Sequence, residues 1–477
     1  MKNTGMKQLF LSRFARVFEK DGLVALIHQL QPEPVYLSKK MWYNIVASAT
    51  IEIPMNRLAA ELVAHKLLIA DPYSDRQILE DVRRRTLHSL NRPTILYLMM
   101  APRCNFACTY CPIPALAERY TPQLLSFEDA VAGITLWKKH IEEYPKDDNS
   151  YFLIFYGGEP LLNCGVFKRL LAYVSKEYDT GQLPQKLKLV LCTNGSLIDE
   201  QLMELLIRHH VTVSIGIDGQ QEHNDRTRIT SDSNSTFSGL ERVIKQLVEN
   251  GIRVTASVII TPTNVHQLEK YPNFLQKLGI AQFGFNLMKG NALTRQLNGG
   301  SMENYCRSSA QGILSGLANA NKNGQCYEYQ LEKKLVALQN GSPFSVDCTC
   351  YGNQLVIQAD GQVSNCPFLR IDQGHVRELP DTFRIWQTDT VKTWRRRIPL
   401  FNEKIIRDDN VDILDGGGCA WSSFELYGDV STRDINNAIF TKEVMHELIW
   451  TLLPTNQANA IRRGKTTHWS YRRVRNM

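Results

Sequence analysis

Short apolar runs alternate with amphipathic segments along the middle of this 477-residue chain. The apolar runs predict six strands, and the segments between them have apolar residues at helical spacing. The predicted strands cover residues 95–100, 151–156, 186–193, 212–217, 253–260 and 281–287. The predicted helices cover residues 127–144, 166–178, 200–208, 237–250 and 265–278. This alternation predicts an α/β fold with a parallel sheet, and six βα units suit a partial (β/α)6 barrel over residues 93–300.

The first 92 residues have a less regular pattern. Two short strands, 23–28 and 35–37, are expected to flank a proline-containing turn at 31–34. The pattern then predicts helices near 39–47 and 55–65, a strand at 67–70 and a charged helix at 75–90. This order favours a winged-helix-like module over residues 1–92, which either docks a peptide or caps one end of the barrel.

Three further parts follow the barrel. Residues 301–344 are interpreted as a helical linker, and residues 345–430 hold four cysteines. Residues 431–477 are expected to form one helix, at 437–453, and a basic tail. The last 17 residues contain six basic side chains and no acidic one: Arg462, Arg463, Lys465, Arg472, Arg473 and Arg475. Such a tail is typical of a solvated end, although it could also hold an acidic peptide or nucleic acid.

Composition narrows the class of protein. The hydrophobic fraction of 43% is normal for a globular core, and the net charge of +7 is mildly basic. Eleven cysteines are an odd number for a disulfide framework, and their clustering favours metal binding in a reducing compartment. No signal peptide and no run of about 18 apolar residues is evident, so a cytoplasmic protein is expected.

The strongest chemical signal is a triplet of cysteines after the first predicted barrel strand. Cys104, Cys108 and Cys111 are spaced C-x3-C-x2-C. Thiolates are the usual ligands of iron–sulfur clusters, whereas a structural zinc site needs four ligands. Three cysteines on a 4Fe–4S cube leave one iron open. The arrangement resembles the radical S-adenosylmethionine (SAM) superfamily, in which the open iron chelates SAM.

Further motifs at the ends of later strands support this resemblance. Gly157, Gly158 and Glu159, before a proline, resemble the GGEP motif of the family. The resemblance implies that these residues contact the SAM amino group. Thr193 and Asn194 resemble the TNG element that lies beside SAM.

A third motif departs from the family pattern. Residues 216–228 resemble the SxDG…HDxxR run of peptide-modifying members, but the usual serine is Gly216 and the usual histidine is Asn224. Ser214 is a candidate to supply the missing serine contact with SAM. Arg228 matches the arginine that pairs with the SAM carboxylate in the family, a role that suits a guanidinium. The carboxylates in this run, Asp218 and Asp225, are interpreted as structural.

The cysteines of residues 345–430 resemble those of SPASM and twitch domains, which hold auxiliary clusters. From Cys350 the spacing is C-x10-G-x4-C, and a hairpin turn at Gly361 is expected to bring Cys350 and Cys366 together. Cys419 resembles the closing cysteine of these domains. The resemblance implies one auxiliary 4Fe–4S cluster on Cys348, Cys350, Cys366 and Cys419, with Cys348 or Cys350 as a possible spare. A zinc site on the same thiolates is the alternative.

The resemblance implies an oxidoreductase that cleaves SAM to a 5′-deoxyadenosyl radical and abstracts hydrogen from its substrate. The preferred hypothesis is a RiPP maturase, which forms an intramolecular cross-link in a ribosomally made precursor peptide bound by the N-terminal module. A flavodoxin or ferredoxin would be the reductant. The alternatives are an anaerobic sulfatase-maturating-like protein modification and a small-molecule radical SAM dehydrogenase.

Two observations weigh against the sulfatase-maturating alternative. Residues 283–290 contain no carboxylate, and the cysteines for a second auxiliary cluster are absent. A regulator that binds DNA through the N-terminal module and senses redox state is a further alternative, which the intact SAM motifs disfavour; nucleic acid is therefore not the expected partner. No catalytic residue is assigned beyond the cluster ligands, because packing is the expected role of Tyr110 and Tyr156.

Overall fold

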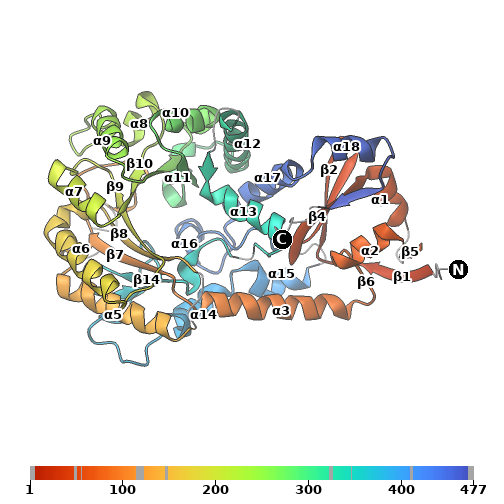
Figure 1. Ribbon diagram of the computed structural model, residues 1–477, viewed down its shortest axis with the longest axis horizontal. Helices are drawn as coiled ribbons and strands as arrows, with labels where there is room; N and C mark the ends of the chain where they lie inside the picture. The colour runs from red at the N-terminus through yellow and green to blue at the C-terminus, as the bar shows by residue number, and fades with distance from the viewer. Residues whose placement is uncertain are drawn as a thin grey trace.

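The structure is a computed structural model that describes residues 6–47, 51–54, 56–113, 123–144, 149–321, 326–344, 346–408 and 412–470. A large sheet with its helices forms one lobe, and an N-terminal module forms a second lobe (Figure 1). The long helix α3 (Tyr73–Leu90) runs from the second lobe to the first strand of the large sheet. Among the described residues, no helix has both the length and the apolar character needed to cross a membrane.

The large sheet confirms the predicted central parallel sheet. Six parallel strands lie side by side in chain order: β7 (Ile95–Ala101), β8 (Tyr151–Gly157), β9 (Leu187–Thr193), β10 (Thr212–Gly216), β11 (Val254–Ile260) and β12 (Gln282–Leu287). Helices connect them: α5 (Phe127–Glu142), α6 (Cys164–Asp179), α7 (Glu200–Arg208), α8 (Gln221–Thr227), α9 (Phe237–Glu249) and α10 (Tyr271–Lys277). Each strand therefore ends at the same edge of the sheet, where the predicted motifs lie.

The regions after the sixth strand extend this sheet at both sides. The sheet has nine strands in the order β13-β12-β11-β10-β9-β8-β7-β14-β15. Strand β13 (Tyr327–Glu328) lies inside the predicted linker and pairs in parallel with β12. The linker interpretation is therefore incomplete, because a strand of 301–344 belongs to the sheet. The linker's helices α12 (Met302–Ala320) and α13 (Tyr329–Asn340) flank that strand.

The cysteine-rich region joins the other side of the sheet. Strand β14 (Gln354–Ile357) pairs in parallel with β7, and β15 (Val363–Ser364) pairs with β14 in antiparallel orientation. The predicted hairpin at Gly361 is confirmed, and Gly361 has the positive φ of 79° that favours glycine. Helix α11 (Gly290–Leu297) follows β12. The cysteine-rich region also contains α14 (Asp389–Arg395), α15 (Glu403–Arg407) and α16 (Ala420–Tyr427).

The N-terminal module contains more strands than the sequence pattern indicated. Its strands and helices are β1 (Met6–Leu11), β2 (Ala15–Lys20), β3 (Leu23–His28), β4 (Gln31–Ser38), α1 (Lys39–Ile45), β5 (Ile51–Pro54), α2 (Arg57–Ala64) and β6 (Leu68–Ile69). The turn predicted at 31–34 is wrong, because these residues begin β4 and the turn lies at Gln29 and Leu30. Pro32 and Pro34 are tolerated there because they precede the stretch of β4 that pairs with its outer neighbour.

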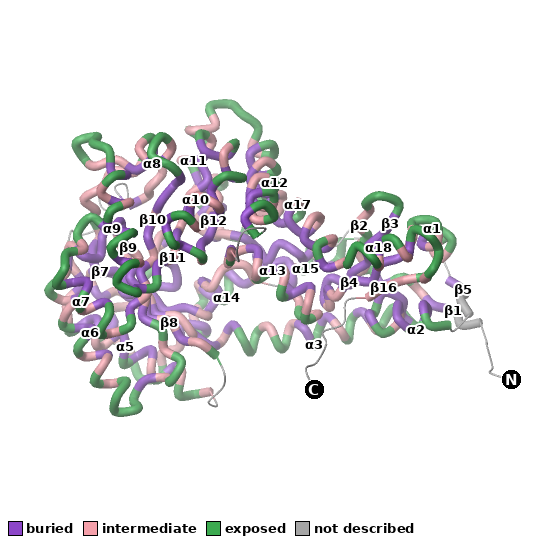
Figure 2. Tube along the Cα trace, turned by 45° about the horizontal axis from the view of Figure 1, so that its top comes forward, coloured by how far each residue is buried: buried purple, intermediate pink, exposed green. Residues whose placement is uncertain are grey.

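The basic tail is folded up to Ser470, and its described basic side chains, Arg462, Arg463 and Lys465, are exposed, as expected of a solvated end. After α17 (Ile435–Thr451), helix α18 (Thr455–Arg462) leads to β16 (His468–Ser470). Strand β16 pairs antiparallel with β4, and Trp469 packs against Tyr36 with ring centroids 5.6 Å apart. Arg472, Arg473 and Arg475 lie outside the described residues. Figure 2 shows the buried strands of both lobes, joined by the partly exposed helix α3.

Candidate metal and cofactor site

The loop after β7 carries the first three cysteines to the edge of the sheet. Cys104, Cys108 and Cys111 line one cavity and are close enough for their charges to interact. Two backbone hydrogen bonds hold the loop against the next strand end: Gly158 N donates to Ala101 O (2.8 Å) and Glu159 N to Arg103 O (2.9 Å). A side chain at Gly158 would overlap the carbonyl of Arg103, so only glycine permits this approach.

The donor set fits an iron–sulfur cluster. Burial raises the pKa of Cys104 and Cys108, and raises that of Cys111 to about 12, so bound metal must drive their ionisation. In the described part of the chain, no three His, Cys, Asp or Glu side chains converge as ligands of a single metal ion. A 4Fe–4S cluster makes a different demand, because each thiolate binds a separate iron of a larger group.

Six of the seven predicted SAM contacts line the same cavity, Ser214 and Arg228 among them, and Glu159 does not. Gly157, Gly158, Thr193 and Asn194 are lining residues. The buried carboxylate of Glu159 instead accepts hydrogen bonds from Thr193 Oγ1 (2.8 Å), Asn194 N (2.8 Å) and Leu161 N (3.0 Å). Asn194 Nδ2 in turn donates to Cys104 Sγ at 3.6 Å. Glu159 therefore positions the residues that face the cavity.

Arg228 lies in the cavity wall beside the cysteine loop. Its Nη1 donates to Tyr110 Oη at 2.6 Å, and Tyr110 Oη donates to Asp218 Oδ2 at 2.6 Å. Burial opposes the charge of Arg228, but Tyr110, Cys108 and Asp218 raise its pKa above the usual value. The Nε atom of Arg228 is buried without a hydrogen-bond partner among the described residues. Tyr110 thus links the cysteine loop to Arg228, which is more than the packing role expected for it.

Gly216, the departure from the family serine, gives Arg228 its space. A Cβ atom at residue 216 would lie 2.6 Å from both terminal nitrogens of the Arg228 guanidinium. The guanidinium therefore occupies the volume that a side chain at residue 216 would fill. Ser214, the candidate substitute for that serine, also lines the cavity. Asp225 accepts from Thr236 N (3.1 Å) and Phe237 N (3.0 Å) at the start of α9, in keeping with its structural interpretation.

The four cysteines of the later region form a second group. Cys350 and Cys366 are buried, Cys348 and Cys419 are half-buried, and all four are close enough for their charges to interact. The Cys350 thiol hydrogen-bonds to Cys348, which lowers the pKa of Cys348, while burial raises that of Cys366 to about 12. The structure brings the predicted ligands together, and the contact between Cys348 and Cys350 leaves either of them available as the spare. This all-sulfur set also fits a cluster.

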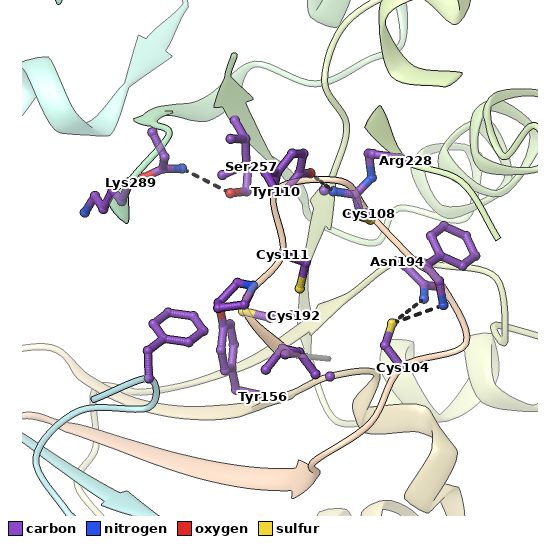
Figure 3. Close-up of a pocket in the computed structure, with 18 of the residues that line it drawn as sticks. Cys104, Cys108, Tyr110, Cys111, Tyr156, Cys192, Asn194, Arg228, Ser257 and Lys289 are labelled. Carbon is purple, nitrogen blue, oxygen red and sulfur yellow. Dashed lines mark hydrogen bonds between the residues drawn. The ribbon is translucent and has the colours of Figure 1, made fainter. Parts of the chain in front are cut away.

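One cavity connects the two cysteine groups. It has a volume of about 370 Å³, and its lining includes the first three cysteines together with Cys419 (Figure 3). Phe368 and Trp421 pack against each other in its wall, with ring centroids 5.5 Å apart, and Tyr156 packs on Phe368. None of the described lining residues is Asp, Glu or His.

The cavity has two charged lining residues, both cationic. Arg228 lies near Cys108, and Lys289 lies on the opposite side of the view (Figure 3). The sequence analysis missed Lys289 and the spatial role of Gly216. The only available signal for Lys289 was its place directly after the sixth strand, where barrel enzymes hold functional residues.

The comparisons with known proteins agree with this arrangement. Residues 98–275 match the Radical SAM superfamily. The serine-type anaerobic sulfatase-maturating enzyme of Klebsiella pneumoniae is 26% identical over 333 residues, which cover 68% of this chain and 81% of that enzyme. The chain spans only 62% of a relative from Methanocaldococcus jannaschii and 44% of the serine-type enzyme of Bacteroides thetaiotaomicron, each 26% identical over the matched part.

Two solved structures share the fold. The structure of anSMEcpe with bound AdoMet and Cp18Cys peptide has a TM-score of 0.59 and 18% identity, and covers 77% of this chain and 99% of that one. Streptococcus suis SuiB bound to precursor peptide SuiA has a TM-score of 0.52 and 15% identity, and covers 89% of this chain and 99% of that one. At these identities the likeness establishes a mixed α/β fold with a central parallel sheet.

Proposed function

We propose that this chain, which carries a radical SAM domain at residues 98–275, is a peptide maturase. Its substrate would be a ribosomally made precursor peptide, and its product an intramolecular cross-link in that peptide. An anaerobic sulfatase-maturating-like modification is the second candidate, and a small-molecule dehydrogenase the third.

The cavity residues divide into those for the first cluster and those for SAM. Cys104, Cys108 and Cys111 would hold a 4Fe–4S cluster, which when bound supplies the electron that starts radical formation from SAM. Gly157, Gly158, Thr193, Asn194 and Ser214 would form the SAM-facing wall. Arg228, held by Tyr110, would pair with the SAM carboxylate. The mostly apolar lining of the cavity would limit water beside a radical, which protects the radical from side reactions.

The observation that carries the proposal is the single cavity between the two cysteine groups. A substrate in it would lie between the first three cysteines and Cys419. The auxiliary 4Fe–4S cluster is part of the proposal, with Cys348 or Cys350, Cys366 and Cys419 among its ligands. The absence of Asp, Glu and His from the described lining disfavours chemistry that needs a carboxylate base in the cavity.

The N-terminal module supports a peptide substrate. It is built around an antiparallel sheet of order β16-β4-β3-β2, and a peptide can bind such a sheet as an additional strand. SuiB, which was solved with its precursor peptide, matches 89% of this chain, a span longer than residues 93–477 alone. A winged-helix-like docking function of residues 1–92, a cytoplasmic location and a flavodoxin or ferredoxin donor remain predictions.

The sulfatase-maturating-like candidate has its own support. Relatives of that class are 26% identical over up to 68% of this chain, and anSMEcpe was solved with a bound peptide. In that case the substrate would be a Cys or Ser in a protein precursor, oxidised to an aldehyde. Residues 283–290 offer no carboxylate for this oxidation.

Intact mass together with hydrazide labelling separates these candidates, because oxidation of Ser to formylglycine also removes two hydrogens. A short peptide encoded beside the gene would be co-expressed with the chain without oxygen, using Cys108→Ala as the inactive control and Cys164→Ala as the matched cysteine control. The proposal predicts loss of two hydrogens per cross-link and no reaction with a hydrazide probe. Because formylglycine is an aldehyde, hydrazide labelling of the product would favour sulfatase-maturating-like chemistry instead. An unmodified peptide alongside active SAM cleavage would contradict the peptide substrate.

A further inference from the structure

Lys289 lies at the junction of two cavities, directly after β12. It lines the large cavity together with Cys419, and it lines a smaller neighbouring cavity that also contains Asp347 and Asp434. Lys289 is the N-cap residue of α11, whose first turn has no side-chain cap. The positive end of that helix adds to the positive charge at this place.

The ammonium of Lys289 has no ion pair of its own. Within the described residues, no carboxylate lies within 4.0 Å of it, whereas the nearby Lys334 pairs with Asp347 at 3.8 Å. Cys419 lines the same cavity and is the largest influence that raises the pKa of Lys289; Asp434 and Cys348 add to this effect. A partly buried cation without a carboxylate is costly, so an anion is expected beside it.

A second, buried cation lies near the same cysteines. Arg397 is fully buried and makes no ion pair among the described residues. Its guanidinium donates to neutral groups only: Tyr351 Oη, Ser423 Oγ, Gly418 O and Thr432 O. Lys289 and Arg397, neither paired with a carboxylate among the described residues, both lie close enough to Cys419 for their charges to interact, an arrangement that fits an anionic group at these cysteines. Thiolate-held clusters are such a group.

We propose that Lys289 is the counter-charge of the auxiliary cluster and raises its reduction potential. This inference rests on the auxiliary cluster of the proposed function. Reduction adds one negative charge to the cluster, and a nearby fixed cation stabilises the reduced form more than the oxidised form. Lys289 acts through the cluster and is therefore a positioning residue, not a catalytic one. By raising the reduction potential, Lys289 makes the auxiliary cluster a better acceptor for an electron from the substrate.

The test is an EPR-monitored redox titration of the full-length protein without peptide. A background with Cys104, Cys108 and Cys111 all changed to Ala leaves only the auxiliary cluster to be titrated. Lys289→Met should lower the ratio of reduced to oxidised cluster about tenfold at a fixed potential, which is about 59 mV for one electron. Lys289→Arg keeps the charge and should titrate like the parent. Lys245→Met removes an exposed charge on α9 and should leave the potential unchanged.

A second variant tests the sign of the effect and guards against misfolding. Asp434 Oδ2 accepts a hydrogen bond from Cys419 N (3.0 Å) and Oδ1 accepts one from Asn437 N (3.3 Å); Asn removes the charge and has one side-chain oxygen that can keep one of these bonds. Asp434→Asn should therefore shift the potential upward, opposite to Lys289→Met. An unchanged potential in both variants would overturn the proposal, as would an equal fall in Lys289→Met and Lys289→Arg. Absence of any cluster from the background protein would also overturn it, whereas the mass experiment on the peptide has an independent outcome.

Discussion

The two cysteine groups are assembled in different ways. The first comes from a single loop of eight residues, Cys104–Cys111, whose spacing alone brings three thiols to one cavity wall. The second draws on residues from Cys348 to Cys419, brought together by a hairpin, a short turn and the start of a helix. In the proposed function the first group would leave an iron open for SAM, whereas the second has four cysteines, which could close its cluster if all of them are ligands. The first group, with ligands from one loop, can face the substrate. The second group, with ligands far apart in the chain, also cross-links the segments that carry them.

The largest expected effect is the loss of SAM cleavage when a cysteine of the first group, but not one outside both groups, is replaced. Cys108→Ala should abolish SAM cleavage, because two cysteines cannot hold the cluster that reduces SAM. Cys164→Ala, outside both groups, should cleave SAM at the parental rate. The measurement is 5′-deoxyadenosine formed by anaerobically reconstituted protein under dithionite. Continued deoxyadenosine formation by Cys108→Ala would contradict the assignment of the first group.

The next effect concerns the second group. Cys366→Ala should lower bound iron by about four atoms per chain while uncoupled SAM cleavage persists, because the first loop does not include this residue. The measurement is the iron and zinc content of the parent protein and of Cys366→Ala. If iron is unchanged and zinc falls, the second group is a zinc site, and the comparison of two clusters is wrong.

A smaller effect is expected at Gly216, which shapes the SAM side of the cavity. Gly216→Ala should weaken SAM binding about tenfold, because the new Cβ would displace the Arg228 guanidinium from its place 2.6 Å away. Gly239→Ala on helix α9 is the matched control, since a Cβ there meets no atom within 4 Å. Equilibrium dialysis with SAM measures both. Equal affinity in the Gly216 variant would mean that Arg228 does not bind SAM.

The smallest effect tests the link between the first loop and Arg228. Tyr110→Phe removes two partly buried hydrogen bonds, each 2.6 Å long, and should weaken SAM binding roughly fivefold, for a loss of about 1 kcal/mol. Tyr178→Phe removes the single exposed hydrogen bond of Tyr178 to Gln185 O and should have no effect. A parental SAM affinity in Tyr110→Phe would limit Tyr110 to packing.

The sequence predicted what depends on local pattern. The six barrel strands, the Gly361 hairpin and the place of the first three cysteines follow from periodicity and spacing, and the structure has them. The prediction failed where distant partners decide the conformation. Residues 31–34 begin a strand because Gln31 and the residues from Val35 to Ser38 pair with β3, and residues 468–470 become strand because β4 offers an edge.

The candidate site shows the same limit. The motif identified Arg228, and the sequence has glycine at residue 216. Only the folded chain shows that the Arg228 guanidinium occupies the space that a side chain at residue 216 would fill. Glu159 was expected to contact SAM, yet its three hydrogen bonds to neighbouring residues turn it away from the cavity. Lys289 belongs to no motif, and its role depends on cysteines more than fifty residues later in the chain.

The most direct test of the two-site account is EPR spectroscopy of the reduced, anaerobically reconstituted protein before and after SAM is added. The account predicts two cluster signals, of which SAM shifts only one. That SAM-sensitive signal should disappear in Cys108→Ala and persist in Cys366→Ala. A single cluster signal in the parent protein, or a SAM-dependent shift that survives Cys108→Ala, would contradict the account.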